Sequence, residues 1–100
     1  VVYHTPGHSK DGICLVGDGK IFSGDTLFVG NCGRIDLPGG SANELYHSLF
    51  DVLHSLDDNL VLYPGHDYGT AKTSTIGTEK TSNPVMQKMN EDSFVDRMGG

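Results

Sequence analysis

Short apolar segments alternate with glycine-rich turns through the first two thirds of the chain. Residues 1–3 are rich in β-forming side chains, and two further runs, residues 13–16 and 20–23, flank Gly17-Asp-Gly-Lys20. An Asp-Gly pair between two such runs is a strong hairpin signal. The pattern therefore predicts one strand followed by a tight antiparallel hairpin.

A longer segment has the period of an amphipathic helix. Ser41-Ala-Asn-Glu44 has the sequence of a capping box, in which the serine accepts from the third amide onward and the glutamate reaches back to the serine amide. Apolar residues then recur every three or four positions, at Leu45, Leu49, Val52, Leu53 and Leu56. This stripe predicts a helix packed on a sheet. His47 and His54 fall on its opposite face, where we expect solvated histidines.

The remaining segments complete an α/β pattern. A continuous apolar run over residues 60–63 ends at Pro64-Gly65 and predicts a buried strand. Residues 26–40 are rich in glycine and predict a loop. Beyond Gly69 we expect a weak helix around residues 75–81, a break at Asn83-Pro84, and a terminal helix over residues 91–98 that Asn90 caps. One hundred residues allow one small α/β domain.

Composition narrows the classes of function. The net charge is −6 and the seven basic residues are scattered, so we expect no nucleic-acid partner, whereas cation binding suits the acidic balance. Without a long apolar run we expect neither a membrane span nor a signal peptide, and we expect a cytoplasmic protein. Cys14 and Cys32 lack the spacing of a zinc knuckle. Cys14 lies in an apolar segment and is predicted to be buried.

Three glycine-marked blocks each carry one residue that can bind a metal. They are Thr5-Pro-Gly-His-Ser9, Ser23-Gly-Asp-Thr-Leu27 and Pro64-Gly-His-Asp-Tyr-Gly69. Each block alone has an ordinary interpretation as a turn or as a side chain that caps backbone amides. Because all three follow β-like segments, we expect His8, Asp25 and His66 to converge in one cleft. Two imidazoles and a carboxylate favour zinc, iron(II) or manganese over calcium.

The order of these blocks resembles the metallo-β-lactamase superfamily, in particular hydrolases similar to glyoxalase II and the related persulfide dioxygenases. The resemblance implies that residues 1–100 form the C-terminal half of an αββα sandwich. It also implies that His8 is the histidine of the third metal motif, that Asp25 bridges two metals or completes one site, and that His66 ligates the second metal. The family's upstream His-x-His-x-Asp-His cluster does not occur in this sequence. The three residues are therefore expected to be half of a ligand set.

The resemblance leaves the reaction open. In the hydrolases two metal ions, expected here to be zinc, hold a hydroxide and polarise the carbonyl of a glutathione-type thioester. In the dioxygenases one iron is held by two histidines and a carboxylate, of which His8 and Asp25 would be two. A third alternative is a non-catalytic remnant or assembly module. In every case we expect little activity from this chain alone, and either self-association or a complementary N-terminal half as partner.

Supporting residues flank the expected metal ligands. His4 is either a group behind His8 or the polar end of a strand. Asp67 and Tyr68 are expected to orient the His66 imidazole through its other ring nitrogen, although Asp67 could equally cap local amides.

A fourth motif points to the substrate. Gly33-Arg-Ile-Asp36 resembles a Gly-Arg-Thr-Asp segment of both subfamilies, in which the arginine can face the carboxylate of a thiol substrate. We expect Arg34 either to bind such a carboxylate or to form an ion pair with Asp36 that shapes the loop.

Overall fold

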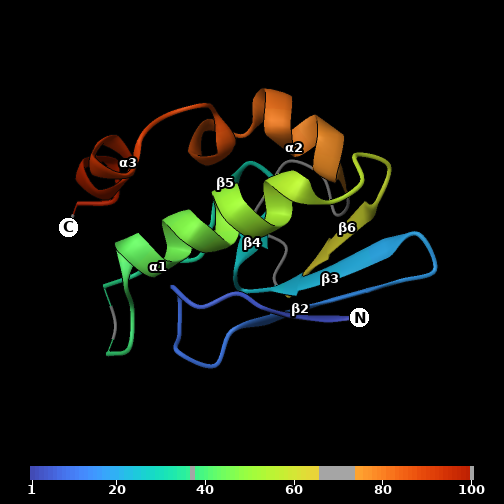
Figure 1. Cartoon of the computed structure of the whole chain (residues 1–100), viewed down its shortest axis with the longest axis horizontal. Coiled ribbons are helices and arrows are strands. Elements are labelled where there is room, and N and C mark those ends of the chain that lie inside the picture. The colour runs from blue at the N-terminus through green and yellow to red at the C-terminus, as the bar shows by residue number, and fades with distance from the viewer. Residues whose placement is uncertain (37, 66–73, 100) are drawn as a thin grey trace.

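The computed structural model describes residues 1–36, 38–65 and 74–99 and shows helices lying along one face of a mixed sheet (Figure 1). The strands of this sheet are β1 (Val2–His4), β2 (Ile13–Gly17), β3 (Lys20–Gly24), β6 (Val61–Pro64) and β7 (Ser74–Thr75). Their spatial order is β1-β2-β3-β6-β7. Strands β3 and β6 run parallel, whereas the other neighbours are antiparallel. The α/β class predicted from the sequence is confirmed.

The predicted hairpin joins β2 to β3. Gly17 pairs with Lys20, and the two residues between them, Asp18 and Gly19, have φ of 52° and 72°. A turn with positive φ at both central positions matches the twist of antiparallel strands, and an Asp-Gly pair tolerates that conformation. The Asp-Gly signal therefore gave both the turn and the register.

A small second sheet interrupts the segment that was predicted to be a loop. It consists of β4 (Leu27–Phe28) and β5 (Asn31–Cys32). Asn83 donates through Nδ2 to the carbonyls of Phe28 and Asn31 at 3.3 and 3.1 Å, and Glu79 Oε1 accepts from the Gly30 amide at 2.8 Å. Strands of two residues carry no visible alternation, and distant side chains hold them in place. The sequence pattern consequently missed them.

The long helix is regular only in its first part. It comprises α1 (Ala42–His47), a π-helical turn η1 (Ser48–Val52) and a 3₁₀ turn η2 (Leu53–Ser55). Ser41 caps α1, because its hydroxyl accepts from the Glu44 amide at 3.2 Å. The reciprocal half of the capping box is not formed in the way predicted: the Ser41 amide donates instead to the Gly7 carbonyl at 2.7 Å. The helix start is thereby tied to the Thr5–Ser9 block.

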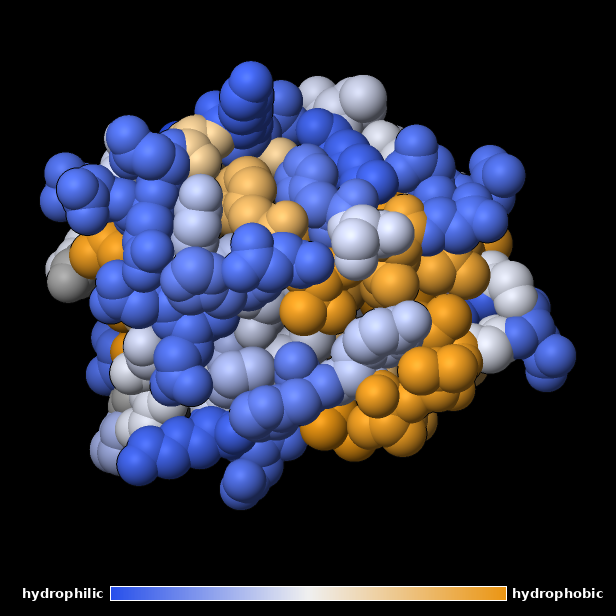
Figure 2. Space-filling view, in the orientation of Figure 1, coloured by the Kyte–Doolittle hydropathy of each residue, from blue (hydrophilic) through white to orange (hydrophobic). Residues whose placement is uncertain are grey.

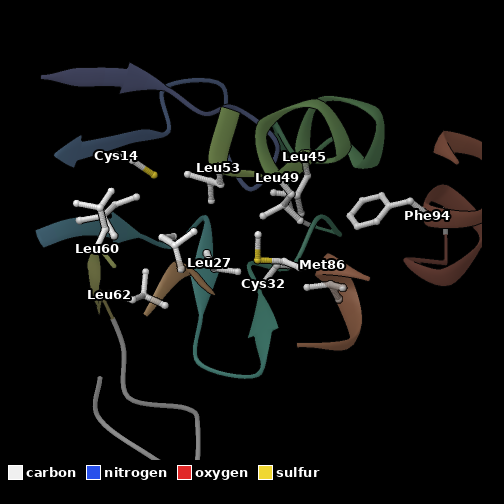
Figure 3. Packing of buried hydrophobic residues seen from close by; sticks show 13 residues of the cluster. Cys14, Leu27, Cys32, Leu45, Leu49, Leu53, Leu60, Leu62, Met86 and Phe94 are labelled. Atoms are coloured by element: carbon white, nitrogen blue, oxygen red, sulfur yellow. The ribbon is translucent and has the colours of Figure 1, made fainter. Parts of the chain in front are cut away.

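The hydrophobic core lies between the helices and the inner face of the sheet (Figure 3). Fully buried members are Cys14, Ile21, Leu27, Leu45, Leu49, Leu53, Leu62, Ile76, Met86 and Phe94. Three leucines of the predicted stripe, Leu45, Leu49 and Leu53, have no exposed surface, so the predicted face of the helix is confirmed. Cys14 is a buried free thiol, as predicted.

The two helix histidines differ from each other. His47 is exposed, as predicted. The prediction for His54 is wrong: its ring is half-buried, stacks on Phe50, and donates through Nε2 to the Met86 carbonyl at 2.9 Å. The helical period placed His54 away from the sheet, but the segment after Asn83 folds back over that side of the helix.

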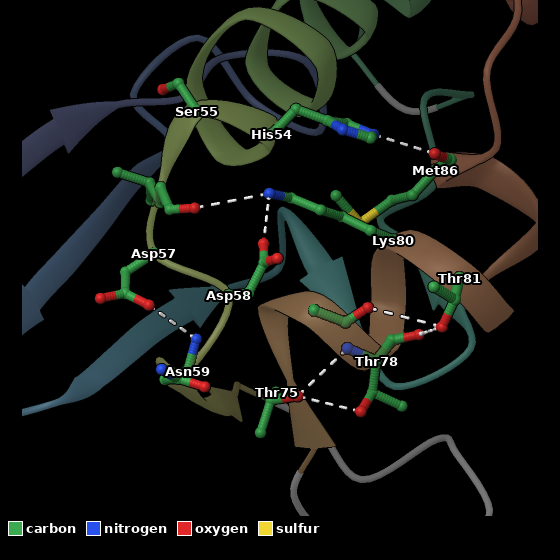
Figure 4. A network of polar contacts seen from close by, with 12 residues as sticks. His54, Ser55, Asp57, Asp58, Asn59, Thr75, Thr78, Lys80, Thr81 and Met86 are labelled. Atoms are coloured by element: carbon green, nitrogen blue, oxygen red, sulfur yellow. Dashed lines mark hydrogen bonds and ion pairs between the residues drawn. The ribbon is translucent and has the colours of Figure 1, made fainter.

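The C-terminal segments form α2 (Ile76–Ser82), a 3₁₀ turn η3 (Pro84–Met86) and α3 (Glu91–Arg97). The Asn90 side chain accepts from the Ser93 amide at 2.8 Å, so the predicted cap of α3 is confirmed. Lys80 of α2 reaches Asp58 Oδ1 at 2.5 Å and joins α2 to the loop before β6 (Figure 4). None of the helices in the described ranges has the length and apolar character needed to cross a membrane.

The outer face of the sheet carries a row of exposed apolar side chains. Val2, Leu15, Phe22 and Tyr63 stand opposite one another across β1, β2, β3 and β6. Their exposed fractions are 63%, 43%, 48% and 36%, and the rings of Phe22 and Tyr63 stack with centroids 5.5 Å apart. In the space-filling view, hydrophobic surface gathers at the strand side of the molecule and polar surface covers most of the helix side (Figure 2). We call these four residues the apolar face.

Candidate metal site

The loop that carries His8 packs against the start of the long helix and is hydrogen-bonded to it. Gly7 has φ of 144°, and a Cβ at this position would lie 2.4 Å from the Cβ of Leu45. Ser48 Oγ donates to the Pro6 carbonyl at 2.6 Å. The glycine of the first block is therefore required by its close approach to α1, and these contacts fix the position of the adjacent His8.

Asp25 lies in the turn that follows β3. Gly24 has φ of 52°, and the Thr26 amide closes the turn by donating to the Ser23 carbonyl at 3.0 Å. The buried hydroxyls of Thr26 and Thr5 lie 3.0 Å apart in a hydrogen bond that links the second block to the first. The loops that follow β1 and β3, two strands separated by β2, thus lie side by side.

The side chains of His8 and Asp25 face each other with Nε2 and Oδ2 3.5 Å apart and are 26% and 35% exposed. The other ring nitrogen, Nδ1, lies 2.8 Å from the Arg34 carbonyl oxygen. Because a carbonyl only accepts, Nδ1 must donate, and in a neutral imidazole Nε2 then presents its lone pair. In this neutral form two acceptor atoms, Nε2 and Oδ2, face each other, and a cation between them would stabilise the pair; in the protonated form Nε2 would instead donate to Oδ2.

Gly33 fills the space behind this pair. A Cβ on Gly33 would lie 1.9 Å from the Asp25 carbonyl oxygen and 2.9 Å from the His8 Cβ. Its amide donates to the Thr26 carbonyl at 3.2 Å. The sequence reasoning linked Gly33 only to the arginine motif and missed its close approach to both His8 and Asp25. Its position in a glycine-marked motif was the available signal.

The third block reaches the same place through its first glycine. The Gly65 amide donates to the Gly24 carbonyl at 2.8 Å, and a Cβ on Gly65 would lie 3.2 Å from Asp25 Oδ1. The next residues in the sequence, His66, Asp67 and Tyr68, lie outside the described residues. Within residues 1–36, 38–65 and 74–99, no third histidine, cysteine or acidic residue joins His8 and Asp25 to form a metal-binding group.

Two other predicted residues have defined partners. His4 Nε2 donates to the Lys10 carbonyl at 2.9 Å across the loop between β1 and β2. Arg34 forms a two-point ion pair with Asp36, with Nε to Oδ1 at 2.6 Å and Nη2 to Oδ2 at 2.7 Å. These hydrogen bonds lower the pKa of Asp36 to about 2. The ion pair within the loop, one of the two arrangements expected for Arg34, is thus present.

Sequence comparison identifies the family. The profile of the metallo-β-lactamase superfamily matches residues 1–66. The chain belongs to this superfamily. It is 49% identical to a hydroxyacylglutathione hydrolase of Tolumonas auensis, over 67% of this chain and 25% of that protein. It is 36% identical to the human mitochondrial persulfide dioxygenase ETHE1, over 95% of this chain and 38% of that protein.

Structural comparison agrees. The crystal structure of ETHE1 from Myxococcus xanthus superposes with a TM-score of 0.93 and 38% identity, covering 99% of this chain and 44% of that one. The metallo-β-lactamase fold predicted from the three blocks is therefore confirmed. The chain spans less than half the length of these relatives.

Proposed function

We propose that this chain is part of a metal-dependent hydrolase that acts on glutathione-type thioesters, and that His8, Asp25 and His66 contribute to a two-zinc centre. The identity to a hydroxyacylglutathione hydrolase supports this reaction class. So does the position of His8 and Asp25, which two motifs bring to one edge of the sheet. In this proposal the remaining ligands come from an upstream half of the fold.

The observation that carries the proposal is the contact between His8 and Asp25. Two ligand atoms about 2.1 Å from one tetrahedral zinc stand about 3.4 Å apart, and Nε2 and Oδ2 are 3.5 Å apart. Ligating histidines usually donate their other ring N–H to a carbonyl or carboxylate, which is what Nδ1 does toward Arg34. The donor set and its geometry therefore fit zinc or iron(II).

The residues have separate tasks in the proposed reaction. Bound zinc would supply a hydroxide at neutral pH and polarise the thioester carbonyl. His8 offers an oriented lone pair, and Asp25 offers a negative charge that offsets the charge of the ion. The Arg34 carbonyl keeps the proton of His8 on Nδ1, and Gly33 leaves room for both ligands.

Persulfide dioxygenation at a single iron is the second candidate. The similarity to ETHE1 proteins extends over nearly the whole chain, further than the match to the hydrolase. His8 and Asp25 would then be two of the three ligands of a facial iron site. A non-catalytic remnant is the third candidate. Two zinc ions, one iron ion or no metal per assembled protein would each select one of these candidates.

We propose further that the apolar face is covered by a second layer, either an N-terminal half or another copy of this chain. Val2, Leu15, Phe22 and Tyr63 form a continuous row on the outer face of the sheet. Exposed rows of this kind mark interaction surfaces.

Complementation tests the function. The zinc-loaded or iron-loaded chain is mixed with the separately produced N-terminal half of a relative and offered S-lactoylglutathione or glutathione persulfide. We expect thioester hydrolysis only in the mixture with zinc, and its loss by several orders of magnitude in His8→Ala. His47→Ala, an exposed histidine on the helix side, is the matched control. If only the iron-loaded mixture is active, and it oxidises glutathione persulfide, the hydrolase proposal is wrong and the dioxygenase is favoured. If no mixture has activity, the non-catalytic remnant is favoured.

A further inference from the structure

The loops that carry His8 and Asp25 do not start from neighbouring strands. Strand β2 lies between β1 and β3, and each of these strands pairs with β2. Since neighbouring strands are about 4.8 Å apart, the chain leaves β1 and β3 at points roughly 10 Å apart. The side chains of His8 and Asp25 nevertheless approach to 3.5 Å between Nε2 and Oδ2. The relative position of the two loops therefore depends on contacts made beyond the strands.

A pair of buried threonines joins the two loops. Thr5 directly follows β1, and Thr26 directly follows Asp25. Their hydroxyl oxygens lie 3.0 Å apart, and the Thr26 hydroxyl donates to the Thr5 carbonyl at 3.4 Å. Because each hydroxyl has one proton, both bonds form together when the Thr5 hydroxyl donates to Thr26 Oγ1. The two residues are 1% and 3% exposed, so water cannot readily replace these hydrogen bonds.

A small side chain of β2 lies beside this pair. Cys14 is fully buried and points into the core (Figure 3). Its sulfur lies 3.4 Å from the Thr5 hydroxyl, and the thiol donates to the Ser23 carbonyl at 3.9 Å. Burial raises the pKa of the Cys14 thiol, and the hydrogen bonds to Thr5 and Thr26 act in the opposite direction. The thiol is therefore a neutral neighbour, and the two hydroxyls remain bonded to each other.

Each threonine is tied to the candidate ligand of its own loop. The Thr5 amide donates to the Gly12 carbonyl at 2.8 Å, which closes the loop that contains the histidine ligand. Thr26 is the next residue after the aspartate ligand, and its carbonyl accepts from the Gly33 amide at 3.2 Å. A displacement of either threonine therefore moves one ligand relative to the other.

We infer that Thr5 and Thr26 are positioning residues of the metal site, and that the hydrogen bond between them holds His8 and Asp25 at the separation that one ion requires. The inference rests on the proposed function, because the ion is the one that His8 and Asp25 would share. Neither threonine contacts the ion, and each acts through its own loop. Loss of either hydroxyl lowers the affinity for the metal. Loss of both has little further effect, because the same hydrogen bond is removed.

Calorimetric zinc titration of the metal-free chain and its variants tests this role. Thr26→Val keeps the shape of the side chain and removes the hydroxyl, whereas Thr26→Ser keeps the hydroxyl and removes the methyl group. We expect Thr26→Val and Thr5→Val each to weaken zinc binding about tenfold, and the double variant to be weakened by about the same factor. Thr26→Ser should bind like the parent. The matched control is Thr78→Val, which removes an exposed hydroxyl bonded to Thr75 at 2.9 Å and should also bind like the parent.

A spectroscopic signal separates positioning from a general loss of stability. The ¹⁵N signal of His8 Nε2 in the metal-free chain responds to the Asp25 carboxylate 3.5 Å away. It should shift in Thr26→Val and Thr5→Val and stay in place in Thr26→Ser. Should the valine variants not fold, the parent supplies the test. Because coupling is reciprocal, zinc should slow the exchange of the buried Thr5 and Thr26 hydroxyl protons with water.

The inference is overturned if the folded valine variants bind zinc as tightly as the parent, if Thr26→Ser is weakened as much as Thr26→Val, or if the two valine substitutions weaken binding multiplicatively. It is also overturned if zinc leaves the exchange of the hydroxyl protons unchanged.

Failure of this inference is distinguishable from failure of the proposed function. Zinc binding that is equal in the parent and the valine variants would remove the positioning role and leave the metal site. A parent that binds no zinc, but whose His8 Nε2 signal depends on the Thr26 hydroxyl, would remove the metal function and leave a link between the two loops.

Discussion

At the scale of single residues, the lack of a side chain at Gly33 allows His8 and Asp25 to lie close together. Replacing Gly33 by alanine is expected to weaken zinc binding at least tenfold and to destabilise the fold, because the new Cβ would lie 1.9 Å from the Asp25 carbonyl oxygen. The matched control is Gly17→Ala, where no atom lies within 4 Å of the added Cβ and φ is not positive. Calorimetric zinc titration and urea unfolding measure both effects. Equal behaviour of the two variants would refute the packing role of Gly33.

The sequence predicted that His8 and Asp25 lie close together, but not how their side chains are oriented. His8 and Asp25 are visible because glycine-marked turns after apolar segments predict strand ends that converge. The group that orients His8 is the Arg34 carbonyl, and every residue has a carbonyl. A hydrogen bond to a main-chain carbonyl depends on the path of the loop and does not require a particular residue type, so the sequence cannot predict it.

At the scale of elements, two buried side chains, Glu79 of α2 and Asn83 at its C-terminal cap, support the hairpin that borders the site. Asn83→Ala removes the donors to the Phe28 and Asn31 carbonyls and to Glu79 Oε1. Since it leaves buried acceptors unpaired, we expect a loss of about 1–3 kcal/mol in the free energy of unfolding. Urea denaturation compares it with Asn59→Ala, an exposed asparagine, which should change stability by less than about 0.5 kcal/mol. A similar small loss in both variants would contradict the anchoring role.

The contact between α1 and α3 should respond to pH. His47 binds Asp51 of η1 at 2.6 Å and Glu91 of α3 at 3.3 Å. The hydrogen bond to Asp51, followed by the charge of Glu91, raises the pKa of His47 above 6.5. Folding thus favours the protonated ring. The stabilisation is complete below pH 6.5 and is lost as the pH rises through the raised pKa of the folded state.

Urea midpoints measured on both sides of this window check the contribution of His47. The parent should lose stability as the pH rises from below 6.5 through the raised pKa of His47, by less than about 1 kcal/mol because the groups are exposed. His47→Gln should lack this part of the pH dependence. Asp36 does not contribute in this window, because its pKa is about 2. Identical pH profiles for the parent and His47→Gln would contradict the assignment.

Strong local signals predicted most of the elements, and tertiary contacts account for the exceptions. The Asp18-Gly19 turn, the Asn90 cap and the leucine stripe lie where the sequence predicted them. The β4–β5 hairpin and the partial burial of His54 were missed, because both depend on the segment around Asn83 and Met86. Local periodicity carries no information about that partner segment.

At the scale of the whole molecule, the apolar face should drive association. We expect the chain to self-associate at micromolar concentration, because the row from Val2 to Tyr63 leaves hydrophobic surface in water. Phe22→Thr keeps a residue that favours strands and removes the stacked ring, so it should shift sedimentation toward the monomer. Asn59→Thr, in an exposed loop, should sediment like the parent. A parent that sediments only as a compact monomer would contradict this prediction.

The central claim is that His8 and Asp25 hold one metal ion between them. Long-range ¹H–¹⁵N spectra of the histidine rings, recorded during zinc titration, test it most directly. In the metal-free chain the proton of His8 should lie on Nδ1, and zinc should shift the Nε2 signal while leaving that proton in place. Binding should be weaker than nanomolar and at least tenfold weaker in Asp25→Asn. A His8 ring protonated on Nε2, with signals that zinc leaves unchanged, would contradict the account.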